Sequence, residues 1–365
     1  MNSRYPVPGT KLKDLDTPCL LIDLDAFEHN IQLMANFYRE RTVKLRPHTK
    51  NHKSPLIAHM QIQAGGTVGG VCTAKVSEAE VMVQGGINQV LIANQIVTKD
   101  KISRLISLAR RAEIIVAADD VRNVQDLADA TQTAGVELGV IVEVDTQMGR
   151  CGVRTVEHGI EIAQAINAKP FLNMRGIMSH QTIPPTEERE TRVLQGRKMI
   201  EKVIDLKTAL VNIGIPVEIV STGETWSYDV ASDIDGVTEI QGGSYLLMEA
   251  GYSFMSEFHY ACKILGTVIS AVRPGRAIGD IGIKAIGTPK GLPLLEGSPG
   301  TIVEELHAEH VILNTESGSD LNPGENFTLI PGQQDIMVSR WDRFIAVRNG
   351  EVEAVWDIPG RGCHN

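Results

Sequence analysis

The sequence predicts an α/β protein with a (β/α)8 TIM barrel over residues 18–255 and a β-domain built from residues 1–17 and 256–365. Short apolar, β-branched runs alternate with amphipathic helical stretches as far as about residue 250. Such strand–helix units imply parallel strands, and eight or nine of them favour closure into a barrel over an open sheet. After about residue 255, the strand-like runs follow one another with only turn signals between them.

Nine strand-like runs mark the first part of the chain. They are residues 19–22, 43–46, 67–72, 89–93, 114–117, 138–144, 171–178, 217–220 and 237–240. The stretches between them have helical spacing. Ser77-Glu78-Ala79-Glu80 predicts a capping box for a helix that ends at Gly85. Asp120 predicts the N-cap of a helix over 121–134 that stops at Gly135. The charged stretch from 187 to about 211 predicts a long surface helix.

The last hundred residues contain seven short β-like runs. They are residues 263–272, 276–278, 301–305, 310–313, 326–330, 343–348 and 351–356. Asn349-Gly350 between the last two runs predicts a hairpin. This part of the chain therefore predicts an all-β domain.

Composition narrows the classes of function. Lys+Arg 35 against Asp+Glu 45 gives a formal charge of -10, and no basic stripe is present, which argues against nucleic acid or an anionic membrane as partner. The five cysteines are scattered and odd in number, as expected for buried thiols in a reducing compartment. We expect a soluble, cytoplasmic protein, because neither a signal peptide nor eighteen consecutive apolar residues occur.

Three segments could carry chemistry. The basic run 46–53 follows the second strand-like run, at the barrel end where active sites lie, and a lysine there can form a Schiff base with a carbonyl. A solvated basic loop is the alternative. The glycine-rich turns 221–225 and 241–245 follow late strands, where barrels commonly bind phosphate. Together the segments predict a phosphorylated cofactor whose carbonyl end binds the lysine and whose phosphate binds the glycine-rich turns.

Several ordered blocks carry a resemblance that spans nearly the whole chain. They are Asp16-Thr17-Pro18, Arg46-Pro47-His48-Thr49-Lys50, Lys75-Val76-Ser77-Glu78-Ala79, Glu143-Val144-Asp145, Gly149-Arg150-Cys151-Gly152-Val153 and residues 239–245. With them the sequence resembles the D-threonine aldolase and D-serine dehydratase family of pyridoxal 5'-phosphate (PLP) enzymes. The resemblance implies an alanine-racemase-like fold (PLP fold type III), a PLP-binding barrel with a β-domain, and a homodimer.

The resemblance also implies roles for individual residues. Lys50 matches the lysine that binds PLP covalently, and Lys53 matches a second lysine that does not bind it. Arg150 lies where the family has an arginine near the cofactor ring, and His180 is a candidate for cofactor contact and for proton transfer. The residues that match the phosphate turns are Thr222, Gly223, Thr225, Gly243 and Ser244.

Two departures from the family concern the reaction. In the metal-binding segment Gln333 replaces a histidine, and Asp335 remains as a ligand for a divalent ion such as Mg²⁺ or Mn²⁺. Gln181 replaces the histidine expected to act on the β-hydroxyl, while His180 lies one place earlier. The resemblance predicts a lyase that cleaves or dehydrates a D-β-hydroxy-α-amino acid. The alternative enzyme is a racemase or epimerase that needs no metal. A non-catalytic PLP carrier would usually lack the β-domain.

Overall fold

A computed structural model describes residues 5–181, 188–297, 300–315 and 321–365. The chain divides into two compact units. The first comprises Met1–Leu33, Asn51–Ser54 and Ser244–Gly362, and the second comprises Met34–Lys50, Pro55–Gly243 and Cys363–Asn365. No helix in the described part of the chain is long and apolar enough to cross a membrane.

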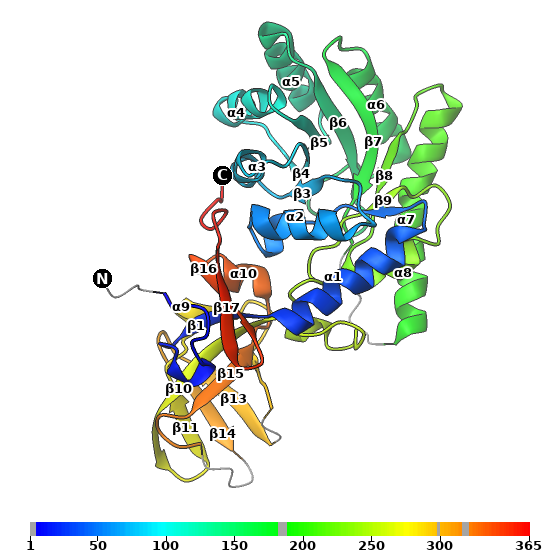
Figure 1. Cartoon of the computed structure of the whole chain (residues 1–365). Helices are drawn as coiled ribbons and strands as arrows, with labels where there is room; N and C mark the ends of the chain where they lie inside the picture. Colours follow the sequence, from blue (N-terminus) through cyan, green and yellow to red (C-terminus); the bar gives the residue numbers. More distant parts are fainter. Residues whose placement is uncertain (1–4, 182–187, 298–299, 316–320) are drawn as a thin grey trace. The chain divides into compact units, whose positions relative to one another are not determined.

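The second unit contains a sheet of eight parallel strands (Figure 1). They are β2 (Lys44–Leu45), β3 (Val71–Thr73), β4 (Gln89–Gln95), β5 (Glu113–Ala118), β6 (Leu138–Val144), β7 (Leu172–Ser179), β8 (Ile219–Ser221) and β9 (Glu239–Ile240). Their order is β2-β9-β8-β7-β6-β5-β4-β3. Parallel bridges Leu45–Thr67 and His48–Cys72 join the two ends of this path. The predicted fold class is confirmed.

Helices follow the strands, as the crossover rule requires. They are α1 (Leu24–Arg39), α2 (Pro55–Ala64), α3 (Val76–Gln84), α4 (Lys99–Ala109), α5 (Val121–Ala134), α6 (Val156–Asn167), α7 (Arg189–Asn212) and α8 (Tyr228–Ala231). Figure 1 shows α3, α4, α5 and α6 outside strands β3 to β7. Helix α5 has its predicted ends, because Asp120 accepts a hydrogen bond from the Arg122 amide and Gly135 adopts a left-handed conformation (φ 61°).

The start of α3 corrects one prediction. Ser77 was expected to cap this helix, but the helix begins at Val76 with Lys75 at the N-cap position. The Ser77 hydroxyl donates to the Asn365 backbone oxygen, and the Glu78 carboxylate accepts from the Ala74 amide at 2.8 Å. Because the helix begins one residue before Ser77, Ser77 lies inside the first turn.

The first unit holds the other sheet. Its strands are β1 (Cys19–Asp23), β10 (Cys262–Arg273), β11 (Arg276–Gly279), β12 (Leu294–Leu295), β13 (Thr301–Leu306), β14 (Val311–Thr315), β15 (Asn326–Ile330), β16 (Arg343–Arg348) and β17 (Glu351–Asp357). The order is β13-β14-β11-β10-β1-β16-β17, with β15 paired to β10 and β12. Asn349 (φ 51°) and Gly350 (φ 76°) form the predicted turn between β16 and β17.

Strand β1 corrects another expectation. The run 19–22 was counted among the barrel strands, but β1 pairs antiparallel with β10 and parallel with β16. Leu21 packs with Leu265 and Ile345 in the core of this sheet. A strand buried on both faces has the same apolar pattern in either sheet, so the sequence alone does not distinguish them.

Candidate active site

Polar side chains gather at the carboxyl ends of the barrel strands, above an apolar layer. The layer consists of Cys72, Leu91, Ile115, Ala117, Ile141, Met178 and Ile219. Side chains alternate along a strand, so the residue two places beyond an inward one also faces inward. By this alternation Glu143 follows Ile141 on β6, and His180 follows Met178 at the end of β7. Active sites of barrel enzymes lie at this end.

Lys50 follows β2 on a short 3₁₀ helix, η2 (Thr49–Asn51). The Thr49 hydroxyl donates to the Cys72 carbonyl at 3.2 Å, which ties this turn to β3. Burial raises the pKa of the Cys72 thiol to about 12, and the charges of Arg46 and Lys50 only partly oppose this. The thiol therefore stays protonated near neutral pH, and Lys50 is the better candidate for a nucleophile in this part of the site.

A glutamine connects the ends of β7 and β8. Gln181 is 1% exposed. Its Nε2 donates to Ser179 Oγ at 2.6 Å and to Thr222 Oγ1 at 2.8 Å, and its Oε1 accepts from the Gly223 amide at 2.9 Å. An amide held in this way is not a base. Where the family has a catalytic histidine, this chain therefore has a glutamine that connects the ends of two strands.

Glu143 and Gln95 form a second polar pair in the barrel. Gln95 Nε2 donates to Glu143 Oε2 at 2.6 Å. Burial raises the pKa of the Glu143 carboxyl, and this hydrogen bond and the charge of Arg150 only partly oppose the rise. Among the residues that the structure describes, none hydrogen-bonds to the buried Gln95 Oε1. An unpaired acceptor beside a buried carboxyl fits a polar ligand at this end of the barrel.

Of the remaining predicted cofactor-site residues, four belong to the second unit and one to the first. Arg150 is exposed on the loop after β6, and the His180 carbonyl accepts a 3.0 Å bond from Thr146 on that loop. Thr225, which is buried, opens the 3₁₀ helix η3 (Thr225–Ser227). Gly243 is the last residue of the Pro55–Gly243 segment of the second unit. Ser244 belongs to the first unit, where its Oγ lies 3.5 Å from Asn51 Nδ2.

Arg46 is not part of the group of basic residues that the run 46–53 suggested. Its guanidinium pairs with Glu239 at 2.6 and 2.8 Å and donates to Gln89 Oε1 at 3.1 Å. Glu239 and Gln89 are the first residues of β9 and β4, so the Arg46 side chain points toward the opposite end of the barrel. A buried cation needs a buried carboxylate, and Glu239 supplies it. His52 and Lys53, in turn, belong to the first unit.

Sequence reasoning missed Glu143, Gln95 and Gln241 as site residues. Gln241 follows β9, where its Oε1 accepts from Cys72 Sγ at 3.4 Å and its Nε2 donates to Ser221 Oγ at 2.9 Å. A usable signal was present. A carboxylate or amide in an otherwise apolar barrel strand marks a polar group inside the barrel.

The proposed metal segment lies in the first unit. Gln333 precedes the short helix α10 (Gln334–Val338), which contains Asp335. Nearby Glu249 is already bound by the Gln334 amide at 2.9 Å and by Lys290 Nζ at 3.2 Å. Across residues 5–181, 188–297, 300–315 and 321–365, three or more His, Cys, Asp or Glu side chains nowhere cluster as a metal site would require. One free carboxylate beside an amide does not fit a Mn²⁺ or Zn²⁺ site.

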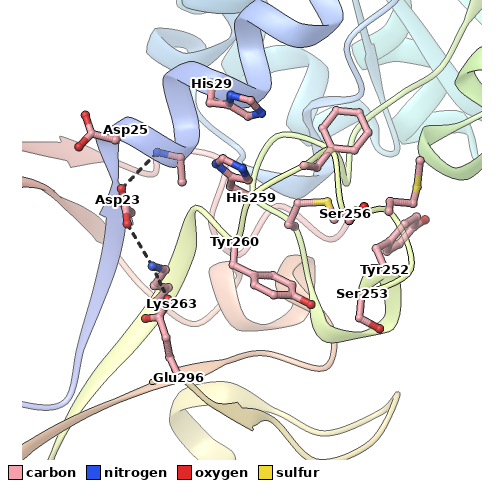
Figure 2. Close-up of a pocket in the computed structure, with 14 residues that line it drawn as sticks. Asp23, Asp25, His29, Tyr252, Ser253, Ser256, His259, Tyr260, Lys263 and Glu296 are labelled. Carbon is pink, nitrogen blue, oxygen red and sulfur yellow. Dashed lines mark hydrogen bonds and ion pairs between the residues drawn. The ribbon is translucent and has the colours of Figure 1, made fainter. Parts of the chain in front are cut away.

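A pocket of about 660 Å³ in the first unit contains none of the predicted site residues (Figure 2). The rings of His29 and His259 stack there with their centroids 4.0 Å apart. Lys263 Nζ lies 3.0 Å from Asp23 and 2.7 Å from Glu296. Because these carboxylates neutralise Lys263, the pocket offers no free amine for covalent chemistry. The barrel therefore remains the candidate site.

A parallel barrel with a lysine after an early strand, glycine turns after the last two strands and a second β-sheet unit defines the alanine-racemase-like class of enzymes. Residues 22–249 match the family described as "Alanine racemase, N-terminal domain", and residues 261–347 match the "Putative serine dehydratase domain". The chain belongs to the D-threonine aldolase and D-serine dehydratase family of this class.

Individual relatives support this assignment. The chain is 36% identical to a 3-hydroxy-D-aspartate aldolase of Paracoccus denitrificans (strain Pd 1222), over 98% of this chain and 95% of that protein. It is 34% identical to a D-threonine aldolase of Arthrobacter sp, over 97% of this chain and 95% of that protein. A solved D-threonine aldolase from Filomicrobium marinum superposes with a TM-score of 0.95, at 35% identity and 99% coverage of both chains.

Proposed function

We propose that this protein is a PLP-dependent lyase that acts on a D-β-hydroxy-α-amino acid, by Cα–Cβ cleavage or by dehydration. The observation that carries the proposal is the similarity to two aldolases over at least 97% of the chain. The related D-threo-3-hydroxyaspartate dehydratase of Delftia sp., 28% identical over 84% of this chain, keeps dehydration open.

The barrel residues fit this role. When bound, PLP withdraws electrons from the substrate's Cα. Lys50 would hold the cofactor covalently, and its amine would move a proton at Cα. Thr222, Gly223, Thr225, Gly243 and Ser244 are proposed to bind the phosphate, with Arg150 and His180 near the ring. Gln95 and Glu143 supply further polar contacts.

Product analysis tests the proposal. The chain is incubated with PLP and the D- and L-forms of threonine, serine, 3-hydroxyaspartate and phenylserine, and products are separated by chromatography and identified by mass spectrometry. Glycine with an aldehyde or glyoxylate identifies an aldolase, and an oxo acid with ammonia identifies a dehydratase. An inverted Cα centre without fragmentation contradicts a lyase.

Two observations favour a second candidate, an amino-acid racemase or epimerase. Gln181 is fully hydrogen-bonded where the family has a histidine, and Gln333 replaces the metal-binding histidine. Inversion at Cα needs no activation of a β-hydroxyl. It needs Lys50 and an acid or base on the opposite face, for which His180 is the candidate.

Treatment with a chelator is expected to reduce activity by less than about twofold, because Asp335 beside an amide is a weak donor set for a divalent ion. The turnover rate is measured after EDTA and again with added Mg²⁺ or Mn²⁺. Asp335→Asn serves as the control and is expected to behave like wild type. A loss of about tenfold or more that Mn²⁺ reverses would show a functional metal site and contradict this prediction.

The remaining features of the family are also proposals for this chain. We propose a cytoplasmic homodimer in which the barrel of the second unit binds PLP. The family resemblance supports the dimer, and light scattering of the purified holoenzyme tests it. A mass near twice 39.8 kDa is expected.

A further inference from the structure

We propose that Gln181 is a positioning residue that orients the Thr222 hydroxyl, within a turn that its own backbone bonds hold rigid, as a donor to the cofactor's phosphate. The inference rests on the proposed PLP-dependent function. It assigns a role to the residue at which this chain differs from the family's catalytic histidine.

The contacts of Gln181 use every polar group of its side chain. The Nε2 group carries two hydrogens and donates one to Ser179 Oγ and one to Thr222 Oγ1, at 2.6 and 2.8 Å. Its Oε1 accepts from the Gly223 amide at 2.9 Å. Gln181 thus hydrogen-bonds to two consecutive residues of the turn after β8, Thr222 and Gly223. A carboxylate has no hydrogen to donate, and an imidazole cannot form these three bonds with the same geometry.

The hydrogens in this cluster can be counted. Ser179 Oγ and Thr222 Oγ1 lie 2.6 Å apart and share one hydroxyl proton. Both oxygens already accept from Gln181, so the second hydroxyl proton must donate elsewhere. Within the described ranges, neither hydroxyl makes a further hydrogen bond. Either hydroxyl can donate the proton that the two oxygens share. The proposal takes Ser179 as that donor, which leaves the Thr222 hydroxyl proton for the phosphate.

The turn itself is rigid. Gly223 has φ 93°, and a Cβ at this position would lie 2.7 Å from Ala231 Cβ. The Thr222 amide donates to the Glu239 carbonyl at 3.0 Å, and the Gly223 carbonyl accepts from the Gln241 amide at 3.2 Å. Because the backbone is fixed on both sides, Gln181 determines the direction of the Thr222 hydroxyl more than the path of the chain.

The test compares the affinities of the whole chain for PLP and for pyridoxal, which lacks the phosphate. Dissociation constants are measured by absorbance titration for wild type, Gln181→Met and Thr222→Val. In both variants the ratio of the pyridoxal constant to the PLP constant is expected to fall about 10- to 100-fold, the effect of one hydrogen bond to a charged group. Pyridoxal affinity is expected to change by less than about threefold.

Two further variants separate positioning from a general structural effect. Asn123→Leu removes a buried amide that donates to the Ile96 carbonyl in the same unit, and it should leave the ratio unchanged even if it lowers the melting temperature. In the double variant Gln181→Met/Thr222→Val, the ratio should equal that of Thr222→Val alone, because Gln181 acts through Thr222.

The inference is overturned if Gln181→Met keeps the wild-type ratio, or if it weakens PLP and pyridoxal equally. If Gln181→Met does not fold, a wild-type ratio in Thr222→Val overturns it. In these cases wild-type PLP binding, and with it the proposed function, still stands. A wild-type chain that does not bind PLP overturns both.

Discussion

Replacement of Lys50 by alanine is expected to abolish covalent attachment of PLP and to reduce turnover at least about 10²–10⁴-fold, the usual contribution of proton transfer by a positioned side chain. Lys50 lies after β2 on the 3₁₀ helix η2, where the neighbouring Cys72 thiol is held protonated. No other amine is proposed to bind the cofactor. The visible absorbance of the protein–cofactor complex and single-turnover rates measure the two effects.

Lys44→Ala is the matched control. Lys44 lies at the start of the same strand, where its Nζ donates to the Tyr38 and Arg39 carbonyls at 3.0 Å. This variant should keep both the absorbance and the turnover. Lys50→Arg should behave like Lys50→Ala, because a guanidinium keeps the charge but does not form the covalent link. Persistence of the absorbance in Lys50→Ala would show that another lysine holds the cofactor.

Local signals predicted the elements well, because each is determined by a few neighbouring residues. Asp120 caps the start of α5 and the left-handed Gly135 terminates it, as the sequence predicts. Contacts between residues that are distant in sequence could not be predicted. The oxygen that binds Ser77 comes from Asn365, and the partners of β1 come from the last third of the chain. Residue 187, the predicted first residue of the long helix, lies outside the described residues.

The same division holds for the site. The placement of Lys50 and of the glycine turns after barrel strands could be predicted, because barrel topology brings strand ends together. Their roles in binding the cofactor stay predictions. The role of Gln181 could not, because its partners Thr222 and Gly223 lie about forty residues away. Arg46 was misplaced for the same reason. A basic residue in a basic run suggests a surface, and only the position of Glu239 shows that the side chain turns inward.

Arg46→Met is expected to lower the free energy of unfolding of the second unit by about 3–5 kcal/mol, because it leaves the Glu239 carboxylate buried without a counter-ion. The side chains of Arg46 and Glu239 are only 2% and 4% exposed. Burial opposes the charge on Arg46, but the charge and hydrogen bonds of Glu239 outweigh it and raise the pKa of the guanidinium. Arg46 therefore keeps its charge throughout the neutral range.

Urea unfolding followed by tryptophan fluorescence measures this effect. Of the three tryptophans, Trp226 is buried in the second unit, whereas Trp341 and Trp356 belong to the first. In a Trp341→Phe/Trp356→Phe background, the signal therefore reports on the barrel. The midpoint should fall while the denaturant dependence stays constant.

Arg104→Met is the matched control, because Arg104 pairs with Glu80 through two bonds of similar length, at 2.7 and 2.6 Å. These side chains are 31% and 29% exposed, so solvent can replace the lost partner and the cost should stay below about 1 kcal/mol. The double variant Arg46→Met/Glu239→Leu should recover most of the loss, since two apolar side chains leave no buried charge. If Arg46→Met costs no more than Arg104→Met, water or another cation must reach Glu239, and the barrel interior is wetter at this end than its burial implies.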